Sequence, residues 1–219
     1  MKTRLAAGDA LIVVDVQNDF LPGGSLAVPE GDAVIPVLNR YIALFNGKGL
    51  PVFATRDWHP PDHCSFRPQG GRWPPHCIAG TAGAAFPAAL ELTSGTRIIS
   101  KADTQAKDAY SGFEGTPLNA LLQAAAVRRV FVGGLATDYC VLNTVKDALR
   151  CNYATFVIED AVRAVNVKPD DGAHALEEMR RLGAVPLRLE ALEGTSKNSK
   201  FAQMQGAGKI SQRRICDDM

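Results

Sequence analysis

The strongest constraint on the fold is that short apolar runs alternate with longer stretches of helical periodicity along most of the chain. Six runs rich in Val, Ile and Leu have the length and composition of buried strands, and they lie at 10–14, 51–55, 97–100, 129–133, 154–158 and 184–189. Stretches with helical periodicity lie between them, at 33–47, 116–127, 138–151 and 169–182. This alternation predicts right-handed βαβ crossovers.

Such crossovers build a sheet whose strands are mainly parallel and whose two faces are both covered by helices. We therefore expect an α/β fold with a six-stranded, doubly wound, Rossmann-like parallel sheet. With 219 residues, 46% of them hydrophobic, the chain can bury the core of one such domain. We assign this domain to residues 1–192. Residues 193–219 are polar and lack an apolar stripe, so we expect a mobile tail there.

The composition argues against partners that are recognised through a strong electrostatic field. The chain has 24 basic and 23 acidic residues, which gives a formal net charge of +1. Neither nucleic acid nor a membrane surface is expected as a partner, and a small, roughly neutral ligand suits the chain better. No segment resembles a signal peptide or approaches the roughly 20 apolar residues of a membrane span. Five cysteines, an odd number, indicate reduced thiols, so we expect a cytoplasmic protein.

Three residues suited to catalysis stand at the ends of predicted strands. Asp15 closes the run LIVVD, Lys101 closes RIISK, and Cys140 lies in GGLATDYCV, where a strand passes into a helix. Reactive groups in an open parallel sheet collect beyond the carboxyl ends of its strands. If the three strands are neighbours, a carboxylate, an ammonium group and a thiol converge at one edge, which indicates a cysteine nucleophile with acid/base partners.

The position of Cys140 near a predicted helix N-terminus favours its thiolate form, because free N–H groups and the helix dipole stabilise negative charge there. Attack of the sulfur on an amide carbon gives a tetrahedral intermediate, and the backbone amides of Ala136 and Cys140 are candidates to stabilise its oxygen. Asp15 would carry the thiol proton to the leaving ammonia, while Lys101 would hold the carboxylate. Taken singly, a strand-end Asp is often a turn former and a Lys is often solvated, so the combination carries the hypothesis.

A long irregular segment, from about Asp57 to Ala82, is rich in Pro and Gly and interrupts the alternation. Such loops often carry function. Three of the four histidines in the chain, His59, His63 and His76, lie in it beside Asp57. Carboxylate and imidazole ligands suit zinc, manganese or iron. A hydrogen-bonded histidine cluster stiffened by proline explains the same residues equally well, so both interpretations stay open on the residues alone.

Aromatic side chains accompany this loop. Trp58 and Trp73 lie within it, and Phe20 follows Asp15 closely. An apolar wall beside a metal would suit a flat heteroaromatic substrate. Core packing is the stronger interpretation for Trp58, whereas flanking Pro and Gly residues place Trp73 and Phe20 on loops.

Four motifs in this order resemble the nicotinamidase/pyrazinamidase branch of the isochorismatase-like cysteine hydrolases. The resemblance spans about residues 9–189 and rests on VDVQNDFLPGGSL, DWHPPDHCSF, WPPHCIAGT and GGLATDYCV. It implies an isochorismatase-like hydrolase fold and the hydrolysis of nicotinamide, and also of pyrazinamide, through a thioester on the cysteine. That reaction yields nicotinate and ammonia from nicotinamide and belongs to NAD salvage. The resemblance also implies a homo-oligomer, while the polar tail beyond Glu193 is not a requirement of the family.

The resemblance further implies roles for individual residues. The triad falls on Asp15, Lys101 and Cys140, and a cis peptide between Leu135 and Ala136 leads into the oxyanion hole. The ligands of one divalent metal ion, zinc in the first place with manganese or iron as alternatives, are implied to be Asp57, His59 and His76. His63 matches a position that is a fourth ligand in some members and only nearby in others. The residues expected to contact the substrate are Phe20, Trp73 and Leu135.

Two other functions compete with this one. Related cysteine amidases that act on N-carbamoyl or ureido substrates resemble this chain at the Asp, Lys and Cys positions and need no metal. From a different class, the chain could be a non-catalytic ligand-binding protein on a hydrolase scaffold, since a fold alone never fixes function. A metal bound by the histidine loop separates the first alternative from nicotinamide hydrolysis, and loss of turnover on modification of Cys140 separates the second.

Overall fold

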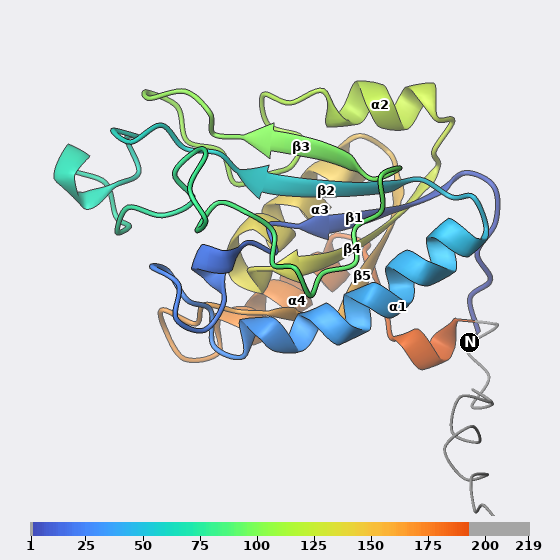
Figure 1. Ribbon diagram of the computed structural model, residues 1–219. Helices are drawn as coiled ribbons and strands as arrows, with labels where there is room; N and C mark the ends of the chain where they lie inside the picture. The colour runs from blue at the N-terminus through green and yellow to red at the C-terminus, as the bar shows by residue number, and fades with distance from the viewer. Residues whose placement is uncertain (1, 193–219) are drawn as a thin grey trace, which may run out of the picture.

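The computed structural model describes residues 2–192, so the tail predicted at 193–219 lies outside the described residues. A six-stranded sheet forms the centre of the domain, with the strand order β3-β2-β1-β4-β5-β6 and parallel pairing throughout (Figure 1). The strands are β1 Asp9–Val14, β2 Val52–Asp57, β3 Arg97–Lys101, β4 Arg129–Leu135, β5 Ala154–Arg163 and β6 Val185–Leu187. The predicted doubly wound parallel sheet is confirmed.

Strand β5 shows the largest difference from the predicted strand lengths. The apolar run at 154–158 marks only the first half of β5, which continues to Arg163. The pairing register between β4 and β5 shifts after Val132, whose partner is Val157, because Gly134 pairs with Val162. A bulge of this kind bends a strand and breaks the apolar pattern, so periodicity alone ends the strand too early.

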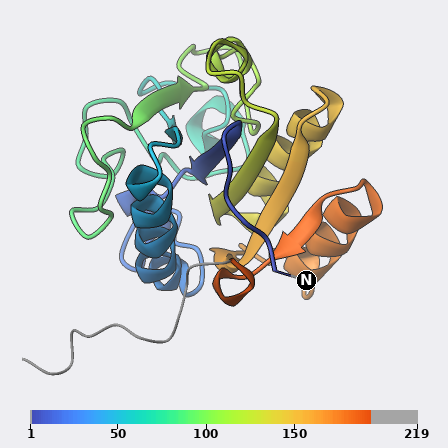
Figure 2. The ribbon, with the colours of Figure 1, turned by 90° about the vertical axis from the view of Figure 1, so that its right-hand side faces the viewer.

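Within residues 2–192, four α-helices cover both faces of the sheet (Figure 2). They are α1 Val34–Gly47, α2 Leu118–Ala124, α3 Leu142–Arg150 and α4 Asp171–Arg181. Helix α1 packs on one face, and the other three helices pack on the opposite face. The helix predicted at 138–151 is divided, because Thr137–Val141 form a π-helical turn before α3 begins. Single π-helical turns often occur at functional sites.

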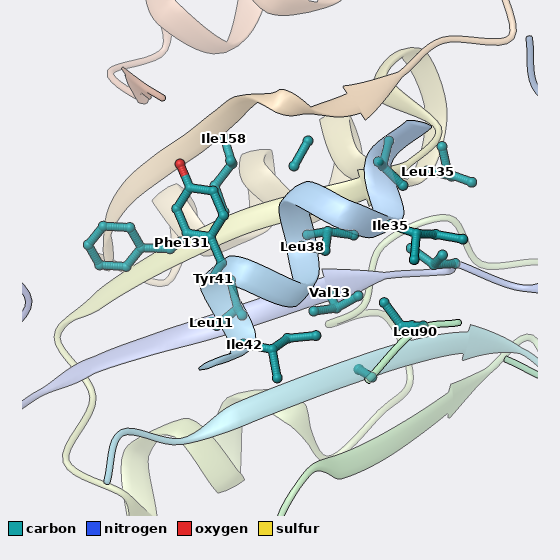
Figure 3. Close-up of a cluster of buried hydrophobic side chains, with 14 of the residues drawn as sticks. Leu11, Val13, Ile35, Leu38, Tyr41, Ile42, Leu90, Phe131, Leu135 and Ile158 are labelled. Carbon is teal, nitrogen blue, oxygen red and sulfur yellow. The ribbon is translucent and has the colours of Figure 1, made fainter. Parts of the chain in front are cut away.

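The apolar stripe of α1 explains how this helix packs on the sheet. Leu38, Tyr41 and Phe45 recur at helical spacing, and each is fully buried. Figure 3 shows Leu38 and Tyr41 lying over Leu11, Val13 and Phe131 of the central strands.

Helix α1 ends where Gly49 adopts a left-handed φ of 65°. This turn allows the Leu50 N–H to donate back to the carbonyl of Phe45 at 2.9 Å.

Two further properties concern the expectations about membranes and thiols. Within residues 2–192, no helix has both the length and the apolar character that crossing a bilayer requires. Cys64, Cys77, Cys140 and Cys151 are free thiols. The predicted cytoplasmic location and self-association stay predictions.

Candidate active site

Four neighbouring strands each deliver one functional side chain to the same end of the sheet. Asp57 and Lys101 are the last residues of β2 and β3, Asp15 directly follows β1, and Cys140 follows β4. These strands are adjacent in the order β3-β2-β1-β4. Their arrowheads point toward the end of the domain where the long loops gather (Figure 1). From β1 the strand order proceeds to β3 on one side of the sheet, and from β4 it proceeds to β6 on the other side. The switch point between β1 and β4 is the place where open α/β sheets bind ligands.

The predicted triad is assembled in this crevice. Lys101 Nζ lies 3.0 Å from Asp15 Oδ2 and 3.5 Å from Cys140 Sγ. It also donates a hydrogen bond to the carbonyl of Ala109 at 3.1 Å. The sulfur of Cys140 lies within 4.8 Å of a carboxylate oxygen of Asp15. The three side chains form one contiguous buried cluster at 6%, 1% and 0% exposure for Cys140, Lys101 and Asp15.

Asp15 has one committed oxygen and one available oxygen. Oδ1 accepts a hydrogen bond of 2.6 Å from the hydroxyl of Thr55, which is itself fully buried. Oδ2 has the ion pair with Lys101 but accepts no hydrogen bond from any of the residues that the structure describes. A buried carboxylate oxygen with a vacant acceptor position can take a proton from a neighbouring group. Asp15 Oδ2 is therefore suited to receive the proton of the Cys140 thiol.

Burial controls the protonation of this cluster. It raises the pKa of the Cys140 thiol well above its ordinary value, although Lys101 acts in the opposite direction. It also raises the pKa of Asp15 against the effect of Lys101. Burial alone would lower the pKa of Lys101, but Asp15, Asp57 and Cys140 hold that pKa well above its usual value. The ammonium group therefore stays charged.

The structure opposes the expectation that the helix start favours the thiolate form of Cys140. The residue lies inside the π-helical turn, where it is 6% exposed, and this burial raises the pKa of its thiol. The sulfur must lose its proton during the attack, which makes the available oxygen of Asp15 more important.

Asp57, His59 and His76 form a second group directly beside the triad. One possible ligand atom from each lies within 4.8 Å of the others, and all three residues are buried. Nδ1 of His59 contacts the carbonyl of Ala102 at 3.0 Å, and Nδ1 of His76 contacts the carbonyl of Pro74 at 2.8 Å. Because a carbonyl only accepts, each Nδ1 carries a hydrogen, and in a neutral imidazole this leaves the lone pair on Nε2.

This donor set suits a divalent metal ion. Carbonyl contacts at the far ring nitrogen are the usual means of orienting metal-binding histidines. Burial, together with the nearby His76, lowers the pKa of His59 to about 3, so its imidazole is neutral as ligation requires. Asp57, His59 and His76 could therefore hold a metal.

His63 is arranged differently. Its ring stacks on His59 with centroids 4.1 Å apart, but both of its nitrogens have protein partners. Nδ1 contacts the hydroxyl of Ser65 at 2.8 Å, and Nε2 contacts the carbonyl of Lys107 at 3.2 Å. Ligation by His63 would require breaking one of these contacts, so its role as a fourth ligand stays a prediction.

Asp57 joins the two groups. One carboxylate oxygen accepts a hydrogen bond from Lys101, and the other lies 3.7 Å from Nε2 of His59. The sequence presents the triad and the histidine loop as separate features. The structure makes them neighbours because β2 lies between β1 and β3.

A cavity that is partly open to solvent lies above these groups. Phe20 and Trp73 line it as predicted, and so do Ala136 and Cys140. The peptide between Leu135 and Ala136 is cis, in agreement with the resemblance. The side chain of Leu135, in contrast, is fully buried in the core on the α1 side (Figure 3) and does not line the cavity. A substrate contact by Leu135 would be limited to its backbone and stays a prediction.

Two tyrosines in the cavity wall were not predicted from the sequence. Tyr110 accepts a hydrogen bond from Nε1 of Trp73 at 3.1 Å, and Tyr139 packs edge-on against Trp73 with ring centroids 5.2 Å apart. Tyr139 directly precedes Cys140, and this adjacency was a usable signal. Tyr110 lies in an irregular segment after β3, where the sequence alone does not indicate that its side chain faces the cavity.

Comparison with known proteins agrees with this geometry. Residues 9–191 match the family described as the isochorismatase domain. The chain is 39% identical to the nicotinamidase of Escherichia coli over 207 residues, which cover 85% of this chain and 97% of that one. It is 44% identical to the nicotinamidase/pyrazinamidase of Mycobacterium tuberculosis over 179 residues, covering 78% and 94% of the two chains. The crystal structure of the pyrazinamidase of Pyrococcus horikoshii in complex with zinc superposes with a TM-score of 0.80 at 49% identity, covering 83% of this chain and 99% of that one.

Proposed function

The chain belongs to the isochorismatase family, and from this membership we propose that it is a nicotinamidase/pyrazinamidase, an amidohydrolase that converts nicotinamide to nicotinate and ammonia. One observation carries the proposal. The sulfur of Cys140, the available oxygen of Asp15 and the ammonium group of Lys101 meet at the base of a cavity lined by aromatic rings, and the Asp57, His59 and His76 donors lie beside them.

The first half of the reaction forms a thioester. Cys140 Sγ attacks the carboxamide carbon while its proton passes to Oδ2 of Asp15, and the carbonyl oxygen takes the negative charge. The backbone N–H groups of Ala136 and Cys140 are the proposed donors to that oxygen. Asp15 then gives its proton to the amide nitrogen, the C–N bond breaks and ammonia leaves. Lys101 keeps a positive charge beside Asp15 throughout these steps.

The second half releases the acid. Asp15 takes a proton from a water molecule as the water oxygen attacks the thioester carbon. The C–S bond breaks, the carboxylic acid product leaves, and the sulfur regains a proton from Asp15. Each proton that Asp15 accepts is passed on, so the triad returns to its starting state.

Asp57, His59 and His76 are the residues proposed to hold a divalent metal, with zinc in the first place and manganese or iron as alternatives. When bound, such an ion supplies a Lewis-acid contact for the ring nitrogen of nicotinamide and so orients the ring. Phe20 and Trp73, which line the cavity, are proposed to flank the ring. Zinc is preferred because the pyrazinamidase of P. horikoshii was solved in complex with it.

Ammonia release from a panel of nicotinamide, pyrazinamide and an N-carbamoyl compound tests this function. We expect turnover of the first two by the wild type, and a loss of at least about 1,000-fold in Cys140→Ala, because no other group replaces the nucleophile. Cys151→Ala is the matched control, since Cys151 is an exposed free thiol. Nicotinamide turnover that survives in Cys140→Ala would refute the mechanism, and exclusive turnover of the N-carbamoyl compound would favour the ureido amidase.

A further inference from the structure

Gln17 is a fully buried polar residue that the reaction leaves without a role. Its carboxamide makes three short hydrogen bonds. Oε1 accepts from the backbone N–H of Asp57 at 2.8 Å, and Nε2 donates to the backbone carbonyl of the same residue at 2.8 Å. Nε2 also donates to the carbonyl of Ala84 at 2.9 Å. One side chain therefore fixes both backbone polar groups of a proposed metal ligand.

The path of β1 explains why a side chain is needed at this point. Backbone pairing between β1 and β2 proceeds to Val13 and Ala54, and the N–H of Asp15 still donates to the carbonyl of Thr55 at 3.2 Å. Asp15 then adopts a left-handed φ of 47°, and the chain leaves the sheet. Asp57 is consequently beyond the reach of the β1 backbone. The carboxamide of Gln17 carries one acceptor and two donors, so it substitutes for the missing peptide group.

The third hydrogen bond extends this support to the chain that carries His76. Ala84 lies in the segment that follows His76, and neighbours of Gln17 hold the same segment. The carboxylate of Asp19 accepts a hydrogen bond from the N–H of Cys77 at 2.7 Å, and the N–H of Asn18 donates to the carbonyl of Ala85 at 3.0 Å. Gln17 thus connects the end of β2 directly with the loop that bears a second proposed ligand.

We infer that Gln17 is a positioning residue for the metal site, acting through the backbone of Asp57. This inference rests on the proposed binding of a metal by Asp57, His59 and His76. Gln17 fixes the direction of the Asp57 carboxylate, which lies between Lys101 and His59. Outer partners of this kind typically change metal affinity by 10- to 100-fold.

The substitution Gln17→Met tests the inference, because Met keeps the length of the side chain and removes all three hydrogen bonds. Zinc affinity is measured by competition with a chromophoric chelator, and the coordination is followed by the visible absorption of Co²⁺ in the same site. We expect Gln17→Met to bind Zn²⁺ about 10- to 100-fold more weakly and to change the Co²⁺ spectrum. If this variant does not fold, Gln17→Glu provides the comparison, because it keeps the acceptor for Asp57 N–H and loses both bonds donated by Nε2.

Asn39 provides a matched control. Its side chain also bridges a backbone carbonyl and a backbone N–H, with 2.8 Å to the carbonyl of Ala89 and 2.9 Å from the N–H of Glu91. Asn39→Leu should destabilise the fold and leave zinc affinity unchanged. The role of Gln17 is overturned if Gln17→Met binds Zn²⁺ with wild-type affinity, or if Gln17→Met and Asn39→Leu lose equal amounts of zinc affinity. A wild-type protein that binds no Zn²⁺ removes the proposed metal site itself, and with it this inference.

Discussion

The hydrogen bond between Thr55 and Asp15 gives the sharpest test of how the site controls its base. Thr55→Val removes the hydroxyl that donates to Oδ1 of Asp15 at 2.6 Å and preserves the shape of the side chain. A hydrogen bond to a charged group stabilises a protein by about 1.5–3 kcal/mol, against about 0.5–1.5 kcal/mol for a neutral pair. We expect the free energy of unfolding of Thr55→Val to fall by the larger amount at pH 8.

The pH dependence of this loss identifies its cause. The hydroxyl favours the carboxylate, so its removal raises the pKa of Asp15, which burial already places above its ordinary value. The loss of stability is therefore complete above that pKa and becomes smaller as the pH falls through it. The acid limb of the kcat/KM profile for ammonia release should move to higher pH for the same reason.

Thr155→Val is the matched control, because the buried hydroxyl of Thr155 donates to a neutral group, the carbonyl of Tyr153, at 3.0 Å. Urea unfolding at pH 8 and pH 5, with the pH profile of turnover, compares the two variants. The control should lose about 0.5–1.5 kcal/mol at both pH values and keep the wild-type acid limb. Equal, pH-independent losses in the two variants would refute the idea that Thr55 stabilises ionised Asp15.

Two further predictions concern the metal ligands and the sheet. In metal-free protein, the pKa of His59 is about 3 against 6.5 in the unfolded chain, so its contribution to stability is complete above pH 6.5 and is lost as the pH falls toward 3. The free energy of unfolding in urea should therefore fall between pH 7 and pH 5 by roughly 2 kcal/mol more in the wild type than in His59→Asn. Parallel curves for the two proteins would contradict the neutral burial of His59. Gly134 has a φ of 127°, and a Cβ there would lie 2.1 Å from the carbonyl oxygen of Val14. In thermal unfolding, the free energy of unfolding of Gly134→Ala should be lower than that of the wild type by more than about 3 kcal/mol. A Cβ at Gly47 meets no atom within 4 Å, so Gly47→Ala should raise the free energy of unfolding by about 0.5–1 kcal/mol. A tolerated Gly134→Ala would show that β1 and β4 can separate.

The sequence by itself determined the strands and helices and their alternation, because periodicity of apolar residues is a local property. It also placed Asp15 and Lys101 at strand ends. Their meeting depended on the order of the strands, which is decided by long-range packing that no local pattern encodes. The bulge in β5 and the π-helical turn around Cys140 were missed for the same reason, since each depends on the neighbouring chain.

Only the tertiary structure decided the electrostatics of the site. The sequence placed Cys140 at a helix start and so favoured a thiolate, but burial beside Asp15 reverses that preference. It also gave no sign that Asp57 pairs with Lys101 as well as facing His59, because β2 comes between β1 and β3 only in the folded sheet. The chemical groups follow from the residues, whereas their protonation and their partners follow from desolvation and contact, which exist only once the chain has folded.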